Sequence, residues 1–134
     1  MPRPTSKQPT EGELEILKVL WEHGPCELGT VCTALRERRE VATTTVATML
    51  KVMLEKGMVK RAKGNRGYSW SARVSPDATR RKLLNNLLSS AFDGSARGLV
   101  TQLVEEGDLS REDLDEIARL LDGAESDGNK RRRT

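Results

Sequence analysis

A chain of 134 residues with only 3% aromatic residues must build its core from Leu, Val, Ile, Met and Ala, which favours helices over a β-sandwich or barrel. No run of about 18 apolar residues occurs, which excludes a membrane-spanning helix, and the first ten residues lack the apolar centre of a secretory signal. Cys26 and Cys32 match neither a redox pair nor a metal-site spacing. We therefore expect two reduced thiols in a cytoplasmic protein, with no metal and no cofactor.

The charge is unevenly distributed along the chain. Residues 1–75 contain 13 Lys and Arg against 8 Asp and Glu, whereas residues 76–126 contain 6 against 11. A basic first half and an acidic second half indicate that the first half faces a polyanion and the second faces away from it. Ordinary variation in surface charge is the alternative.

The first two helices are predicted from capping and breaking residues. Residues 1–9 contain three prolines and are expected to form a flexible arm. Thr10 and Glu13 have the spacing of a capping box for a helix that ends near Glu22. The expected buried stripe of this helix is Leu14, Leu17, Leu20 and Trp21. After a turn or a short edge-strand bridge, a second helix is predicted over about Thr30–Arg38.

Residues 41–70 carry the most informative pattern. A helix is predicted over Thr43–Lys56, because Gly57 suits the left-handed stop that ends a helix. One face of this helix is apolar and consists of Val46, Met49, Leu50, Met53 and Leu54. The opposite face carries Thr44, Thr48, Lys51 and Glu55, with Thr45 and Val52 at its margin.

A basic β-hairpin is predicted directly after this helix. Residues 58–63 and 68–73 flank a Gly-Asn-Arg-Gly turn, whose central residues need the positive φ that Asn65 and Gly67 tolerate. Tyr68 and Trp70 are expected to share one face and to pack on the helices. A polar helix face beside a basic hairpin indicates a winged helix-turn-helix over residues 10–75 and makes DNA binding the leading hypothesis.

Three further amphipathic helices are predicted, at about residues 77–92, 95–106 and 111–122. Ser110 with Asp113 resembles a second capping box, at the start of the last of them. Three short helices cannot bury their apolar stripes efficiently against one another, so we expect a second copy of the chain to cover them. Packing onto the chain's own N-terminal domain is the alternative. Residues 76–122 are therefore a predicted dimerisation domain, and residues 123–134 a predicted disordered basic tail. The expected dimerisation residues are Leu83, Leu84, Leu87, Leu88, Leu99, Val100, Leu103, Leu114, Ile117, Leu120 and Leu121.

The segment Thr44–Leu50, followed by Leu54–Val59, resembles the recognition segment of the penicillinase-repressor family (BlaI/MecI/CopY type). The opening Glu13–Leu17 is similar to that family's first helix, and Arg66 followed by Tyr68-x-Trp70 is similar to its wing. The resemblance covers about residues 8–122 and is most specific in the first 75. It implies a mainly α fold with a small β-hairpin wing, and a homodimeric bacterial repressor that binds a palindromic promoter operator.

Members of this family are induced by two routes, and the chain departs from the family's pattern at the residues of both. In the penicillinase repressors, a membrane sensor metalloprotease triggers cleavage between an asparagine and a phenylalanine in the dimerisation region. The matching candidate cleavage site here is Gln102-Leu103. Copper-responsive relatives carry a C-terminal cysteine-rich motif, whereas no cysteine follows Cys32 in this chain. A third departure concerns DNA contact: Val52 stands where relatives often have a basic residue, so one phosphate contact is expected to be missing.

Short hydroxyl side chains and clustered cations are the expected DNA contacts. Threonine hydroxyls can reach base edges or phosphates, and their methyl groups can contact the thymine methyl, although capping and surface roles are alternatives. Arg66 at the wing tip can enter a minor groove. A dimer that neutralises about six phosphates should lose affinity with salt at a log–log slope near −5. The candidate DNA-binding residues are Thr43, Thr44, Thr45, Thr48, Lys51, Lys60, Arg61, Lys63 and Arg66.

Other classes of function fit the sequence less well. An enzyme is disfavoured, because the one histidine, His23, lies at a helix end and no phosphate-binding loop or metal-spaced cluster occurs. RNA binding would need an aromatic stacking platform. A winged helix that binds proteins would expose an apolar or acidic face on its third helix. A ligand-sensing regulator of another winged-helix family would need a His/Cys/Asp cluster or an apolar cavity.

Overall fold

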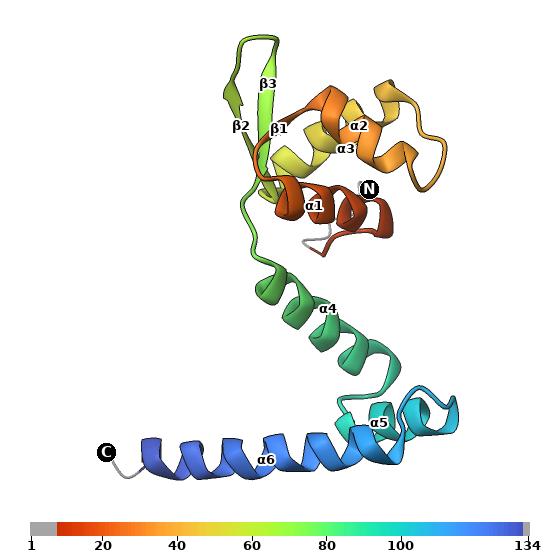
Figure 1. The fold of residues 1–134 in the computed structure, drawn as a ribbon, viewed down its shortest axis with the longest axis vertical. Helices are drawn as coiled ribbons and strands as arrows, with labels where there is room; N and C mark the ends of the chain where they lie inside the picture. The colour runs from red at the N-terminus through yellow and green to blue at the C-terminus, as the bar shows by residue number, and fades with distance from the viewer. Residues whose placement is uncertain (1–7, 133–134) are drawn as a thin grey trace, which may run out of the picture. The chain divides into compact units, whose positions relative to one another are not determined.

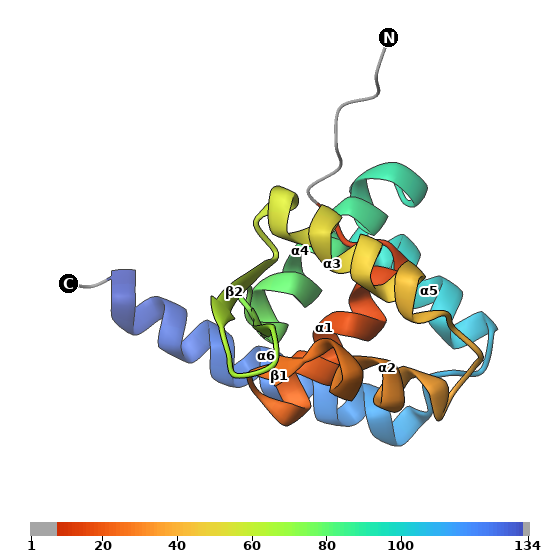
Figure 2. The same ribbon diagram turned by 90° about the horizontal axis from the view of Figure 1, so that it is seen from above.

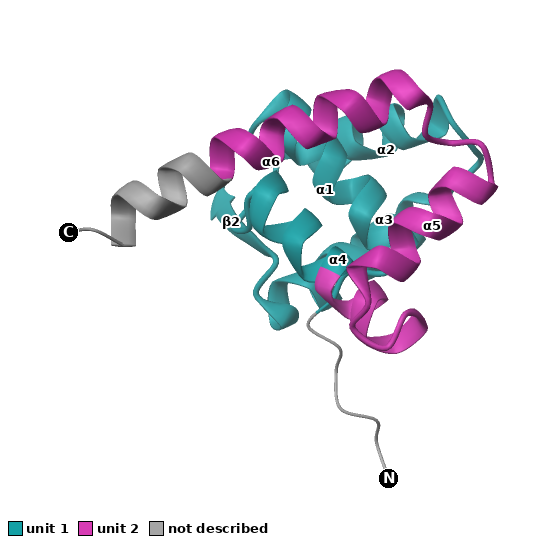
Figure 3. Cartoon of the chain, turned by 90° about the horizontal axis from the view of Figure 1, so that it is seen from below, with its two compact units in different colours: residues 1–84 teal, residues 85–134 magenta. Residues whose placement is uncertain are grey.

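The structure, a computed structural model, describes the backbone of residues 8–132 and the side chains of residues 8–124. The chain forms two compact units, residues 1–84 and residues 85–134 (Figures 1 and 3). The predicted domain boundary ahead of residue 76 differs from this division, which falls inside the fourth helix. The elements are α1 (Glu11–His23), β1 (Cys26–Glu27), α2 (Leu28–Arg36), α3 (Thr43–Lys56), β2 (Val59–Lys63), β3 (Tyr68–Ala72), α4 (Pro76–Ala91), α5 (Ala96–Glu105) and α6 (Arg111–Arg132).

The capping box predicted for α1 is confirmed. The Thr10 hydroxyl accepts from the Glu13 amide at 3.2 Å, and a Glu13 carboxylate oxygen accepts from the Thr10 amide at 2.9 Å. The predicted buried stripe is partly wrong, because Leu14 and Trp21 are only half-buried. Ile16 and Val19 are buried instead, alongside the expected Leu17 and Leu20. The buried face is wider than a simple stripe because α1 contacts both α2 and β3.

The second helix lies two residues earlier than the predicted span Thr30–Arg38. Its start follows directly from the short strand β1, which pairs with β3. Its end is set by a tight turn, in which the amides of Arg38 and Arg39 both donate to the Leu35 carbonyl. The Arg36 side chain then spans the turn into α3, donating to the Val41 carbonyl at 3.1 Å and to the Thr43 hydroxyl at 2.7 Å.

The predicted hairpin is present as β2 and β3, and β1 extends it to an antiparallel sheet of order β1-β3-β2. The register places Arg61 opposite Trp70 and Lys63 opposite Tyr68. The expectation of positive φ at Asn65 is wrong. Gly67 alone in this loop has positive φ, at 134°, so it supplies the reversal that the turn requires.

The hydrophobic core lies within the first unit and joins its three helices to the sheet. Figure 2 shows α2 and α3 beside the hairpin, with α1 beneath them. Gly57 ends α3 with a left-handed φ of 80°, as predicted, and turns the chain into β2. The arrangement confirms the predicted winged helix-turn-helix. The buried apolar residues are Ile16, Leu17, Val19, Leu20, Val31, Cys32, Leu35, Val46, Leu50, Met53, Met58, Val59 and Trp70.

The second unit is helical and holds no fully buried apolar side chain among residues 85–124. The predicted capping box of α6 is confirmed, because the Ser110 hydroxyl accepts from the Asp113 amide and the Asp113 carboxylate from the Ser110 amide. The sequence predicted an end near residue 122, whereas α6 continues to Arg132. The residues after 122 are expected from the sequence to be disordered because their composition is too polar to form a core. No proline follows Gly123, however, so no strong helix-breaking residue ends α6 there. No helix in the described part is both long and apolar enough to cross a membrane.

Candidate nucleic-acid interface

The helix α3 divides into a buried face and an exposed polar face, as predicted. Val46, Leu50 and Met53 are completely buried. On the other side, every candidate DNA-contacting residue of this helix is exposed. These residues are Thr43, Thr44, Thr45, Thr48 and Lys51. Short polar side chains on a helix anchored from behind can approach base edges in a major groove.

Two of these threonines already make hydrogen bonds, and the bonds define what each hydroxyl can still do. The Thr43 hydroxyl accepts from Arg36, which leaves its own hydrogen free to donate to an acceptor such as a phosphate oxygen. The Thr48 hydroxyl donates to the Thr44 carbonyl at 2.9 Å, which leaves its lone pairs and its methyl group available. Thr43 is thus suited to phosphate, and Thr48 to base donors or a thymine methyl.

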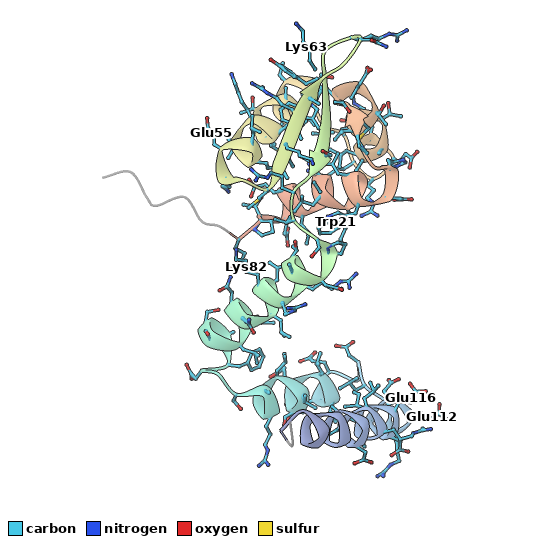
Figure 4. The ribbon with its side chains drawn as sticks, turned by 90° about the vertical axis from the view of Figure 1, so that its left-hand side faces the viewer. Trp21, Glu55, Lys63, Lys82, Glu112 and Glu116 are labelled. Carbon is cyan, nitrogen blue, oxygen red and sulfur yellow. The ribbon has the colours of Figure 1, made fainter. Side chains whose placement is uncertain are left out.

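The cations of the wing lie on two faces of the hairpin. Side chains alternate along a strand and cross-strand partners share a face, so Arg61 and Lys63 lie on the face of Trp70. Lys60 is opposite Ser71 and lies on the other face. Figure 4 shows Lys63 toward the far end of the wing. The structure therefore brings only part of the predicted basic cluster together.

A groove of about 390 Å³ lies between α3 and the wing. Three candidate cations line it from three elements: Lys51 from α3, Arg61 from β2 and Arg66 from the turn. Its remaining lining is mostly apolar and includes Tyr68 and Trp70, with Glu27 as the one carboxylate that the described residues contribute. Lys60 and Lys63 do not line this groove. The groove therefore concentrates positive charge beside the exposed face of α3.

These three cations form no ion pair with a described residue, although the Glu27 carboxylate lines the same groove. Within residues 8–124 the ion pairs are Lys56 with Glu13, Arg39 with Glu15 and Arg80 with Asp77. None involves Lys51, Arg61 or Arg66. Three cations against one carboxylate leave a surplus of positive charge, and such a groove attracts a polyanion and raises its local concentration.

Two features of this region were not predicted from the sequence. Lys56 at the end of α3 donates to both carboxylate oxygens of Glu13 at 3.0 Å, and both side chains are nearly buried. The Arg61 guanidinium lies 4.1 Å from the centre of the Tyr68 ring. Tyr68 is 47% exposed, so the expectation that it packs on the helices is wrong. Only the Trp70 end of β3 reaches the core, because the distal part of the hairpin extends beyond it.

Both cysteines of the first unit are free thiols. Cys32 belongs to the core, and burial raises the pKa of the Cys26 thiol. A raised pKa keeps the thiol neutral and poorly reactive, which fits a structural role.

The apolar stripes of α4, α5 and α6 are largely uncovered in the single chain. A groove of about 610 Å³ runs between α5 and α6 and is lined by Val100, Val104 and Leu114 among others. The candidate cleavage site Gln102-Leu103 lies inside α5, where the Gln102 carbonyl accepts from the Glu106 amide at 2.9 Å. The exposed large apolar residues of these helices are Leu84, Leu87, Val100, Val104, Ile117, Leu120 and Leu121, whereas Leu83, Leu88, Leu99, Leu103 and Leu114 are partly covered.

Comparison with known proteins places the chain in a family. The sequence model of the family described as penicillinase repressor matches residues 9–123. The methicillin resistance regulatory protein MecI of Mammaliicoccus sciuri is 21% identical over 112 residues, which cover 84% of this chain and 91% of that protein. A penicillinase repressor of Bacillus licheniformis is 24% identical over 115 residues, which cover 86% of this chain and 90% of that protein.

Among solved structures, the monomeric form of Bacillus licheniformis BlaI in complex with the blaP half-operator matches with a TM-score of 0.43 and 24% identity. The match covers 57% of this chain and 87% of that one. The family match spans nearly all of the described chain and confirms the resemblance inferred from the recognition segment and the wing. These relatives carry the names of a regulatory protein and a repressor, in agreement with the expectation of a regulator from the sequence. The chain belongs to the penicillinase repressor family.

Proposed function

We propose that this chain is a homodimeric transcriptional repressor that binds a palindromic promoter operator through α3 and the wing of each protomer. The observation that carries the proposal is the groove in which, among the described residues, Lys51, Arg61 and Arg66 converge against a single carboxylate, Glu27, beside the exposed threonines of α3. A repressor of this kind acts on the chromosome in the cytoplasm. It needs no chemistry, because it works by occupying a promoter.

In this proposal α3 lies in the major groove with its threonine face toward the bases. The Thr43 hydroxyl donates to a phosphate, and Thr48 presents its methyl group and lone pairs to base edges. Thr44 and Thr45 lie on the same exposed face and complete the contact. The wing cations on the two faces of the hairpin neutralise phosphates, with Arg66 reaching the adjacent minor groove.

The second unit supplies the pairing of protomers. Its helices expose leucine, isoleucine and valine side chains that a monomer leaves in water, including Ile117 at 47%, Leu120 at 73% and Leu121 at 58% exposed. A second copy that covers the groove between α5 and α6 would bury them. Two paired protomers would hold two copies of α3 about one helical turn of DNA apart, or a multiple of it.

Induction is proposed to act by separating the protomers. A sensor protease that cut Gln102-Leu103 would remove the second unit's contribution to pairing of the protomers. The bond, however, lies in a hydrogen-bonded helix. A protease needs an extended substrate strand, so cleavage there must follow local unfolding of α5. Pairing of two copies would suppress that unfolding.

The DNA proposal is tested by selecting bound fragments from the source genome and measuring fluorescence anisotropy on the selected and a scrambled duplex. The account predicts preferential binding of the selected duplex at physiological salt, with a log–log salt slope near −5. Replacing Thr48 or Arg66 with alanine should weaken that binding. Lys82→Ala is the matched control, because Figure 4 shows Lys82 on α4, at the end of the first unit opposite Lys63. Equal affinity for both duplexes would contradict the proposal.

A further inference from the structure

We propose that Tyr68 is a positioning residue for DNA binding, whose ring holds the Arg61 guanidinium at the groove between α3 and the wing. The inference rests on the proposed DNA-binding function and adds a residue that makes its contribution through another side chain. It assigns a role to an aromatic residue that the core does not use.

The geometry places Arg61 against two aromatic rings. Its guanidinium carbon lies 4.1 Å from the centre of the Tyr68 ring and 5.7 Å from that of Trp70. The rings themselves meet edge to face, with centres 6.2 Å apart and planes inclined by 67°. The strand register accounts for this arrangement, because Arg61 is directly opposite Trp70 and diagonal to Tyr68 on the same face. A buried Trp70 therefore anchors one side of the contact.

Apart from its edge-to-face contact with Trp70, the Tyr68 ring lies outside the core. Its side chain is 47% exposed. The ring lines the groove together with Lys51, Arg61 and Arg66. An aromatic face next to a cation attracts it electrostatically, so the ring restrains a side chain that would otherwise sample many rotamers.

This restraint matters because Arg61 forms no ion pair among residues 8–124, although Glu27 lines the same groove. A guanidinium that lies over a ring keeps the N–H groups at its edge available for a phosphate. Because the side chain is ordered before DNA arrives, binding loses less conformational entropy. Lys63 offers a contrast on the same strand: it is directly opposite Tyr68 but makes no ring contact in the structure.

The test compares Tyr68→Phe, Tyr68→Leu, Arg61→Ala and the double variant Tyr68→Leu/Arg61→Ala by anisotropy on the selected duplex. Tyr68→Phe keeps the ring and should stay within about twofold of the wild type, whereas Tyr68→Leu should lose about two- to fivefold per protomer. The double variant should bind no more weakly than Arg61→Ala alone. Lys63→Ala is the control, and its effect should add to that of Tyr68→Leu.

A DNA-free readout separates this inference from the proposed function. Ring currents should shift the Arg61 Hδ resonances upfield in the wild type and in Tyr68→Phe, and the shift should shrink in Tyr68→Leu. Three outcomes would overturn the positioning role. The losses of DNA affinity for Arg61→Ala and Tyr68→Leu could add in the double variant, or Tyr68→Leu could bind as tightly as the wild type. Tyr68→Phe could also bind as weakly as Tyr68→Leu. A wild type that fails to discriminate between duplexes would instead overturn the proposed function, with the ring-current shift intact.

Discussion

The two units of this chain use the same kind of apolar stripe in opposite ways. In the first unit the stripes of α1, α2 and α3 converge on one another and on the sheet, so that Leu17 and Leu50 are completely buried. In the second unit, helices with equally regular stripes leave Leu120 and Leu121 more than half exposed. Periodicity therefore identifies an amphipathic helix in both units, but it does not say which chain covers the apolar face.

The contrast has a physical origin in the elements available to each unit. The first unit has a sheet that closes one side of its helices, with Val59 and Trp70 contributed by the hairpin. Within the described chain, the second unit has only the end of α4, the short helix α5 and the long helix α6, and no sheet closes their apolar faces. The first unit should thus be stable through its own contacts, whereas the second should depend on a partner.

The largest expected effect is the loss of the buried ion pair that ties the end of α3 to the start of α1. Lys56→Met leaves the Glu13 carboxylate buried without its cation and should lower the free energy of unfolding by about 3–5 kcal/mol. Arg39→Ala is the control, because the Arg39–Glu15 pair is largely exposed and should contribute less than about 1 kcal/mol. Urea denaturation followed by the fluorescence of Trp21 and Trp70, both in the first unit, measures the difference. Equal losses in the two variants would contradict the account.

A matched pair of leucine truncations compares the units directly. Leu50→Ala creates a cavity in the closed core and should lower the free energy of unfolding of the first unit by about 2–5 kcal/mol. Leu121→Ala should change that quantity by less than about 0.5 kcal/mol and should weaken self-association instead. Urea denaturation and sedimentation equilibrium report the two quantities. A Leu121→Ala variant that destabilises the first unit as much as Leu50→Ala would show that the stripes share one core.

The local features of both units could be predicted from the sequence, and the long-range ones could not. The span of α3 and both capping boxes follow from residues within one turn of each other, such as Gly57 at the end of α3. The pair of Glu13 and Lys56 joins residues 43 positions apart, and no local pattern signals it. The early start of α2 depends on the pairing of Cys26 with Trp70, which is also remote in sequence.

For the candidate interface, too, local features could be predicted from the sequence and long-range ones could not. The exposed threonine face of α3 follows from helical periodicity, and it is present as predicted. The division of the wing cations between two faces depends on the strand register, which places Lys60 opposite Ser71. The contact of Arg61 with Tyr68 depends in addition on where the hairpin leaves the core. The DNA contacts themselves stay a prediction.

A smaller expected effect concerns proteolysis of the second unit. Because Gln102-Leu103 lies within α5, cleavage by a nonspecific protease at low concentration should be slow and should speed up severalfold when Leu121→Glu weakens pairing. Mass spectrometry of the fragments identifies the cut bonds. Faster cleavage confined to the first unit would contradict this expectation, because it would show that Leu121→Glu destabilises the core of the first unit.

The smallest expected effect is the pH dependence of the start of α6. Hydrogen bonds from the backbone and the side chain of Ser110 lower the pKa of the Asp113 carboxyl below its ordinary value of 3.8. A lowered folded-state pKa means that the cap stabilises α6 above pH 3.8 and that this stabilisation is lost as the pH falls through the lowered pKa. A carbon-13 titration of Asp113 measures the pKa, and Ser110→Ala should raise it. A pKa of Asp113 at or above the ordinary value would contradict the cap seen here.

The central claim is that a second copy covers the second unit and thereby holds two winged helices at a fixed separation. The dependence of DNA affinity on the spacing of the half-sites tests this claim most directly. Anisotropy is measured on duplexes in which about five or about ten base pairs are inserted between the half-sites of the selected DNA. The account predicts that half a turn reduces the affinity to that of a single half-site and that a full turn restores part of it. An affinity independent of the spacing, with the two half-sites binding one chain each independently of the other, would contradict it.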